Sequence, residues 1–182
     1  MQTTTPTPPA RHAPAIHPDF VSIPWAYALL TSPTTSVFTG RDIQQSKPGP
    51  GREDSLTAVT LQTSETIRAL ASVRVGSSDV TCLLVSLGTG MNGHGGILHG
   101  GIVSTLLDMA TGSAVVALAF TAYLNVTFRK PVPTPSVVLC RGWLVRREGR
   151  KLFIRGTVED GEGGVYAEAD SLFVEVREKA KL

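Results

Sequence analysis

The sequence predicts an α+β fold in which an antiparallel sheet of about six strands curls around one long buried helix. Three observations lead to this prediction. Segments that alternate apolar and polar residues precede and follow a single helical segment, and such alternation is typical of antiparallel strands with one buried face. The helical segment, residues 100–118, is apolar on nearly every side, which indicates burial. The chain has 182 residues, 42% of them hydrophobic, and therefore suits one domain with a substantial core.

Proline and polar caps mark the elements near the N-terminus. Residues 20–30 have the pattern of a short amphipathic helix that starts near Pro24. Asp54 or Ser55 is the expected N-cap of a second short helix, which ends near Gln62.

Six segments have the composition and alternation of strands. Gly76-Ser77-Ser78 separates the first two, as a hairpin turn would. In the last segment the apolar positions change phase at Leu172, which predicts a bulge or a change of neighbour. The expected strands are residues 66–75, 79–87, 121–129, 136–146, 151–159 and 165–176. A single sheet can bury a helix that is apolar all round only if the sheet curls around the helix. This arrangement is the hotdog architecture.

Proline also divides the chain, because nine of the twelve prolines fall in the first 50 residues. We expect a disordered Pro/Thr-rich tail at residues 1–19, a helix and loop extension at 20–53, and the main domain at 54–178. The N-terminal residues contain no apolar signal segment, which favours a cytoplasmic location. The single arginine of the tail, Arg11, gives a mitochondrial presequence no support but leaves that location open.

Charge and composition argue against several classes of function. The formal net charge is +2, without a run of like charges, and this disfavours nucleic acid as the main partner. The longest apolar run, residues 114–120, is too short to span a membrane. Cys82 and Cys140 lie in strand-like runs, as expected for buried free thiols rather than a disulfide scaffold.

Two other patterns are better explained as loops. Residues 88–93 spell G-x-G-x-x-G after an expected strand, but no helix opens at the third glycine and no acidic residue closes a second parallel strand, as a dinucleotide site requires. His94 and His99 lie five residues apart without a neighbouring carboxylate, so no metal site is predicted. The chain also lacks the G-x-S-x-G motif of serine nucleophiles.

The remaining candidate site comprises His99-Gly100-Gly101, at the start of the central helix, and Asp108 within it. N–H groups at a helix N-terminus are unpaired and partly positive, and glycine lets a ligand approach them closely. Such an end can hold the oxygen of a reacting carbonyl. A carboxylate in an otherwise apolar helix is costly unless it is paired or used, so Asp108 is a candidate catalytic group. The alternatives are a buried Asp with a structural hydrogen bond, or one that faces a dimer groove.

The spacing of these residues bears on assembly. Gly100 and Asp108 lie eight residues apart, about 12 Å along a helix axis. A reacting carbonyl must lie within about 3 Å of both the donor and the base or nucleophile. One helix cannot provide this, whereas two antiparallel copies can, with Gly100 of one subunit facing Asp108 of the other. The site therefore predicts a symmetric dimer.

At these residues the chain resembles a known family. The segments HGGIVSTLLDMATG, TAYLNVTFRKPVPTP, REGRKLFIRGTVEDGEG and VYAEADSLFV resemble hotdog-fold acyl-CoA thioesterases of the PaaI-like and THEM-like groups. The resemblance runs from about Asp54 to Val176. It implies hydrolysis of an acyl-CoA thioester by a homodimer or tetramer, without a metal or organic cofactor.

The resemblance also implies roles for individual residues. His99 and Gly101 belong to the motif at the helix start, and the amide of Gly100 is the oxyanion donor. Asp108 is the general base or the nucleophile, and Thr121 is catalytic. The positions expected to contact the substrate are Gly101, Thr127, Arg129, Arg150 and Lys151. From the alternation alone, we expect Thr121, Thr127 and Arg129 to share the polar face of one strand, whereas Arg150 and Lys151 are equally well explained as solvated surface residues.

Three rival functions stay open. The same residues suit release of an acyl group from a carrier protein, whose pantetheine arm replaces CoA. A hotdog hydratase or dehydratase needs a catalytic histidine, and the helix-cap position of His99 argues against that role. A non-catalytic acyl-CoA-binding module has no need of Asp108. The sequence departs from THEM-like relatives in a segment between Asp108 and Thr121 that is about three residues shorter and in a bulky Tyr123, so the acyl pocket can differ there.

Overall fold

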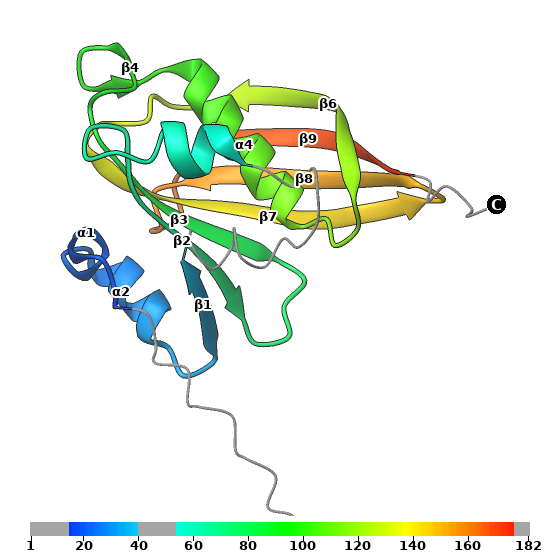
Figure 1. Ribbon diagram of the computed structural model, residues 1–182, viewed down its shortest axis with the longest axis horizontal. Helices are drawn as coiled ribbons and strands as arrows, with labels where there is room; N and C mark the ends of the chain where they lie inside the picture. The colour runs from blue at the N-terminus through cyan, green and yellow to red at the C-terminus, as the bar shows by residue number, and fades with distance from the viewer. Residues whose placement is uncertain (1–14, 40–53, 177–182) are drawn as a thin grey trace, which may run out of the picture.

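The computed structural model describes residues 15–39 and 54–176. Figure 1 shows one central helix, α4, lying against a large sheet. The helical elements are α1 (Pro18–Val21), α2 (Pro24–Thr31), the π-helical turn η1 (Leu56–Thr60) and α4 (Gly100–Ser113). The strands are β1 (Thr35–Thr39), β2 (Ile67–Val75), β3 (Thr81–Leu87), β4 (Asn92–His94), β5 (Ile97–Leu98), β6 (Ala119–Phe128), β7 (Ser136–Glu148), β8 (Lys151–Glu159) and β9 (Val165–Glu175).

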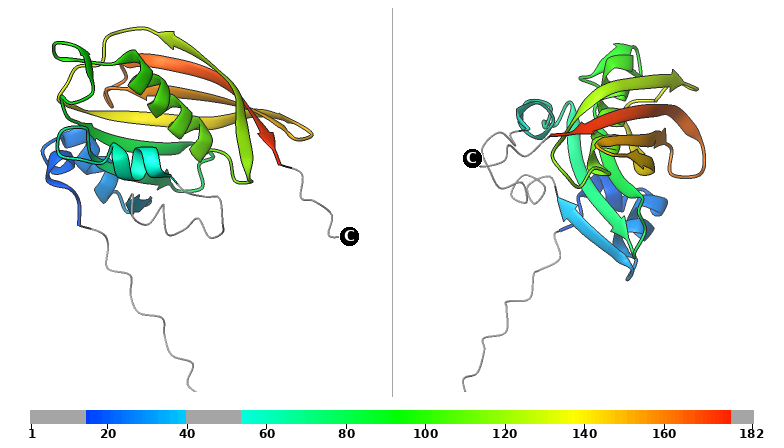
Figure 2. Two further views of the ribbon diagram at one scale, coloured as in Figure 1. Left: turned by 45° about the horizontal axis from the view of Figure 1, so that its top comes forward. Right: turned by 90° about the vertical axis from the view of Figure 1, so that its right-hand side faces the viewer.

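Within the described residues, seven strands form one antiparallel sheet in the order β1-β2-β3-β7-β8-β9-β6. The six strands and the hairpin at Gly76 predicted from the alternation are confirmed. The seventh, β1, was not predicted and pairs with β2 at one edge. β6 lies at the opposite edge, and Figures 1 and 2 show the sheet bending around α4. The hotdog fold predicted from the sequence is therefore confirmed.

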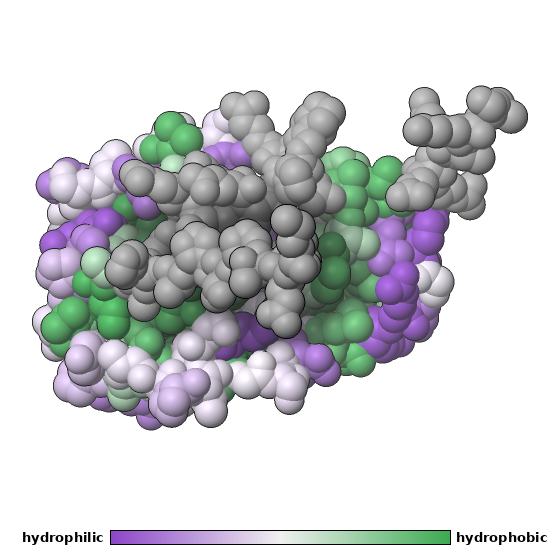
Figure 3. Space-filling view, turned by 60° about the horizontal axis from the view of Figure 1, so that its bottom comes forward, coloured by the Kyte–Doolittle hydropathy of each residue, from purple (hydrophilic) through white to green (hydrophobic). Residues whose placement is uncertain are grey.

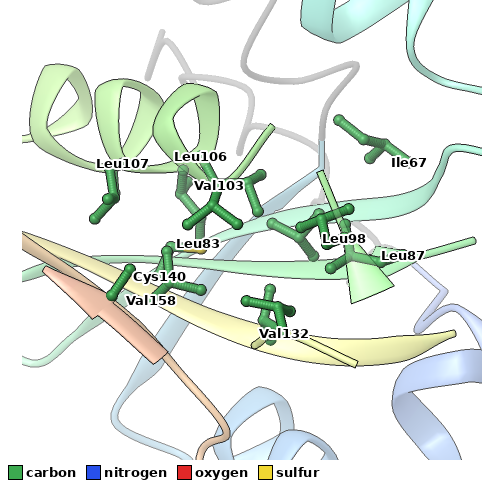
Figure 4. Close-up of a cluster of buried hydrophobic side chains, with 14 of the residues drawn as sticks. Ile67, Leu83, Leu87, Leu98, Val103, Leu106, Leu107, Val132, Cys140 and Val158 are labelled. Carbon is green, nitrogen blue, oxygen red and sulfur yellow. The ribbon is translucent and has the colours of Figure 1, made fainter. Parts of the chain in front are cut away.

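The main core lies between α4 and the concave face of the sheet. Val103, Leu106 and Leu107 point from the helix toward strand residues such as Leu83 and Val158, as Figure 4 shows. Two glycines bring helix and sheet close together. A Cβ at Gly142 on β7 would collide with the carbonyl oxygen of Ala110, and one at Gly156 on β8 would lie 2.7 Å from Thr111 Cγ2.

The central helix differs from its prediction in length and in burial. It ends at Ser113 instead of Leu118, where the N–H groups of Ala114 and Val115 donate to the carbonyls of Thr111 and Gly112. Only the side facing the sheet is buried, while Asp108 on the outer side is exposed. The expectation of a helix buried all round is thus wrong for the single chain. Beyond its end, Val116 is 98% exposed.

The N-terminal elements cover the convex face of the sheet. Phe20, Ala26 and Leu30 of α1 and α2 pack on residues such as Leu84, whose neighbour Leu83 faces α4. The single helix expected at residues 20–30 is two short helices, with Pro24 in the first turn of the second. The predicted tail, residues 1–19, falls mostly in residues 1–14, which lie outside the described part of the chain, but its last two residues, Pro18 and Asp19, belong to α1. Of the two predicted caps, Ser55 is the N-cap of η1, and the carboxylate of Asp54 before it accepts from the N–H and the hydroxyl of Thr57.

An irregularity in β6 changes which side chains face the helix. The pairing of β6 with β9 shifts between Thr121 and Tyr123, so the strand bulges at Ala122. The phase change at Leu172 predicted a bulge or a change of neighbour in this last strand, but β9 keeps one alternation, with Ala167, Ala169, Ser171 and Phe173 all buried. The apolar positions change phase at Leu172 because apolar residues there lie on the convex face of the sheet.

No helix within residues 15–39 and 54–176 is long and apolar enough to cross a membrane.

Candidate active site

The start of α4 presents an N–H group that has no partner among the described residues. His99 is the N-cap, and its Nδ1 accepts from the Gly101 N–H at 2.9 Å. Its backbone N–H is anchored on the Met91 carbonyl at 2.9 Å. Within the described residues the Gly100 N–H has no acceptor, as expected because the first N–H groups of a helix have no partner inside the helix. Gly100 therefore offers the free donor, while Gly101 is engaged by the cap.

Two of the predicted catalytic residues meet directly. The Thr121 hydroxyl donates to Asp108 Oδ1 at 3.0 Å. The bulge in β6 makes this contact, because Thr121 pairs with Phe173, whose ring is buried on the helix side. The hydrogen bond fixes one carboxylate oxygen on the outer side of α4.

Gly100, the predicted oxyanion donor, and Asp108 lie beside opposite ends of β6. A Cβ at Gly100 would lie 3.6 Å from the ring of Phe128, at the end of β6, whereas Asp108 contacts Thr121 near its beginning. Thr121 and Phe128 are separated by about 20 Å at the usual strand rise of about 3.3 Å per residue, one bulged residue allowed for. A single chain therefore does not bring these two predicted catalytic groups together.

The other residues predicted to contact the substrate lie near different ends of β6 and on different faces of the sheet. Thr127 pairs with Glu168 on the convex face, and Arg129 forms an ion pair with the same carboxylate at 2.5 Å. The expectation that they share a face with Thr121 is wrong, because the sequence gives no sign of the bulge at Ala122. Arg150 donates to the Glu175 carbonyl at 2.9 Å, and the exposed Lys151 follows it at the start of β8. Both lie near the Thr121 end of β6, since Ala119 also pairs with Glu175.

A cavity of about 700 Å³ adjoins Asp108. It lies between the outer side of α4, the concave face of β1–β3 and η1. Its wall includes Leu70, Ser72, Arg74, Leu83, Asp108 and Met109. Sequence reasoning did not identify this wall, and the alternation of Leu70, Ser72 and Arg74 on β2 was the one available signal that these side chains share a face.

The histidines and cysteines form no second site in the described residues. No group of three His, Cys, Asp or Glu side chains in residues 15–39 and 54–176 is arranged to hold a metal ion. Both cysteines are free and buried, as predicted, and burial raises the pKa of the thiols of Cys82 and Cys140. Neither thiol is therefore suited to act as a nucleophile.

Comparison with known proteins finds relatives of part of the chain. The family model of the thioesterase superfamily matches residues 95–167, which include the start of α4, Asp108 and Thr121. Acyl-coenzyme A thioesterase THEM4 of Mus musculus is 38% identical over 99 residues, covering 53% of this chain and 43% of that protein. The Bos taurus protein of the same name is 40% identical over 97 residues, covering 53% of this chain and 41% of its own. The chain thus spans less than half the length of these curated relatives.

Solved structures give the same fold. The BH2602 protein of Bacillus halodurans, solved with CoA, superposes with a TM-score of 0.54 at 20% identity, covering 77% of this chain and 88% of its own. At that identity the likeness concerns the fold. Residues 95–167 are therefore similar to the thioesterase superfamily, and the likeness to solved structures supports the hotdog fold.

Proposed function

We propose that this protein hydrolyses an acyl-CoA or acyl-carrier thioester to a free acid and a thiol. The observation that carries the proposal is the hydrogen bond from Thr121 to Asp108, on the wall of a cavity large enough for an acyl group. The matched relatives are named acyl-coenzyme A thioesterases, which supports the same activity here.

The proposed chemistry uses two groups. The thioester carbonyl oxygen accepts a hydrogen bond from the Gly100 N–H, which stabilises the negative charge that develops on it. Asp108 of the partner subunit either removes a proton from the attacking water or attacks the carbonyl itself, forming an anhydride that water then opens. In both routes the C–S bond breaks, the thiolate leaves and water supplies the oxygen and protons of the products. Thr121 holds the carboxylate in position.

A dimer across β6 would assemble this site. β6 is the last strand of the sheet, so within the described residues nothing pairs with its outer edge, and Phe120 and Phe128 are 68% and 56% exposed. Antiparallel pairing of two such edges about their middle puts the Thr121 end of one strand beside the Phe128 end of the other. Asp108 would then lie near the partner's Gly100, and two equivalent sites would form.

We assign the thiol carrier to CoA in the first instance. Arg150 and Lys151 lie near the Thr121 end of β6 and suit the phosphate groups of CoA. Arg129 is held by Glu168 in the single chain, so its contribution requires that ion pair to open or to be shared. A carrier protein would present the same pantetheine thioester to the same residues.

The test is a hydrolysis assay with a panel of acyl-CoAs, acyl-pantetheines and acyl-carrier proteins. We expect turnover by the wild type and a loss of at least about a hundredfold in kcat for Asp108→Asn, which is isosteric but neither a base nor a good nucleophile. Asp79→Asn, at an exposed loop carboxylate, is the matched control. Wild-type kcat in Asp108→Asn would refute the assignment, and preference for acyl-carrier protein would replace CoA as the substrate carrier.

A further inference from the structure

The cavity beside Asp108 contains a cation at some distance from the reacting carboxylate. Arg74 lies on β2 at the same face as Leu70 and Ser72, and all three line the cavity. Its Cα partners are Ser36 on β1 and Thr81 on β3, neither of which carries a charge. Among residues 15–39 and 54–176, Arg74 takes part in no ion pair.

The two carboxylates on the cavity wall are engaged by other groups. Asp54 accepts from the N–H and hydroxyl of Thr57, at 3.1 and 2.6 Å, and Asp108 accepts from Thr121. Within the described residues, the Arg74 guanidinium on the cavity wall therefore has no carboxylate partner. A planar guanidinium in this state suits a ligand carboxylate, which it can bind through two parallel hydrogen bonds.

The part of the cavity between Asp108 and Arg74 is suited to an acyl chain. The hydroxyls of Ser113 and Thr81 lie 2.8 Å apart, and Thr81 is opposite Arg74, so the C-terminal end of α4 is level with Arg74. Asp108 precedes Ser113 by about 7.5 Å of helix, and the step across the paired strands adds about 5 Å. Along this distance of roughly 12 Å, Leu83 and Met109 make part of the cavity wall apolar.

We propose that the cavity holds the acyl chain and that Arg74 binds a carboxylate at its far end, so that the substrates are ω-carboxyacyl thioesters of medium chain length. This inference rests on the proposed thioesterase function. A phosphate group of CoA is the competing anion for Arg74. Asp54 and Asp108 line the same cavity, and they repel a multiply charged phosphate more strongly than a single carboxylate.

A matched pair of substrates tests the proposal. Suberyl-CoA and octanoyl-CoA have the same number of acyl carbons and differ in the terminal carboxylate. We expect the wild type to have the higher kcat/KM on suberyl-CoA. Arg74→Gln should lower that value about tenfold, as loss of a partly exposed charge-assisted contact would, and change the value for octanoyl-CoA less than about twofold. Arg146→Gln, at an exposed arginine outside the cavity wall, is the control and should alter neither value.

The outcomes separate this inference from the proposed function. An equal loss on both substrates in Arg74→Gln would mean that Arg74 contacts CoA, and octanoyl-CoA preferred by both proteins would exclude the ω-carboxylate; each overturns the inference and leaves thioesterase activity standing. If no thioester is hydrolysed, the proposed function fails. Binding of the corresponding thioethers, in which CH2 replaces the carbonyl, then decides the inference: the carboxylated thioether should bind more tightly to the wild type than to Arg74→Gln, and equal affinities would refute it.

Discussion

Replacement of Gly100 by proline removes the proposed oxyanion donor and little else. Gly100 is the first residue of α4, where proline is well accepted, and His99 before it has a ψ of 134°, the extended conformation that proline requires of its predecessor. The helix should therefore form, while the N–H proposed to bind the substrate carbonyl is lost. The matched variant Gly100→Ala keeps the N–H, and its Cβ would lie at an ordinary contact distance of 3.6 Å from Phe128.

The size of the effect follows from the chemistry of the donor. Loss of one oxyanion-hole hydrogen bond costs roughly 3–4 kcal/mol in the barrier, or roughly 10²–10³ in kcat. We expect this loss in Gly100→Pro and a change of less than about tenfold in Gly100→Ala, measured as kcat on the best acyl-CoA substrate with the thermal midpoint as a check on folding. Equal activity of the proline and alanine variants would refute the role of this amide.

Mixing the proline variant with Asp108→Asn tests whether the two groups come from different subunits. A hybrid dimer has one site with both Gly100 and Asp108, and one site with neither. Random exchange makes half of the dimers hybrid, so activity should recover to about a quarter of the wild-type value if the site spans a twofold interface. Each variant incubated alone is the control. If subunit exchange is demonstrated by mass and no activity returns, both groups act within one chain.

Three further predictions concern positioning and stability. Thr121→Val removes the hydroxyl that donates to Asp108 and should lower kcat about tenfold, whereas Thr121→Ser keeps it and should stay within about twofold. Removal of residues 1–31 deletes the buried side chains of Phe20, Ala26 and Leu30 and should lower stability by at least about 3 kcal/mol in urea unfolding, whereas removal of residues 1–14 should leave it unchanged. Gly142→Ala drives a Cβ into the Ala110 carbonyl and should lower the Tm by roughly 5–10 °C, with Gly95→Ala, which has open space, as the control.

The parts of the fold that follow from local pattern could be predicted from the sequence. Alternation with period two identified six strands of the sheet, and the run of apolar residues after Gly100 identified the central helix. β1 was not predicted, because a five-residue edge strand depends on its pairing with β2 more than on its own composition. The end of α4 was placed too late because residues 114–118 continue the apolar run without continuing the helix.

The candidate site was predictable as a set of residues and less so as a geometry. A lone carboxylate in an apolar helix and a glycine pair at its start drew attention to Asp108 and Gly100 without any structure. The contact of Asp108 with Thr121 depends on the bulge at Ala122, and a bulge is a property of two paired strands that one strand's sequence does not reveal. The same bulge explains why the predicted common face of Thr121 and Thr127 was wrong.

The exposure of the site in the single chain is itself informative. Asp108 is exposed, and two phenylalanines near the ends of β6 are more than half exposed, although preorganised donors and bases stabilise charge best where water is excluded. Gly100 and Asp108, the two groups proposed to react, lie beside Phe128 and Thr121, at opposite ends of a strand whose outer edge has no partner in the described residues. An antiparallel copy of that strand would bury the aromatic rings, exclude water from the carboxylate and bring a second Gly100 to it in one step. The edge of the sheet that a solitary domain would need to protect is therefore, in our proposal, the place where the active site is completed.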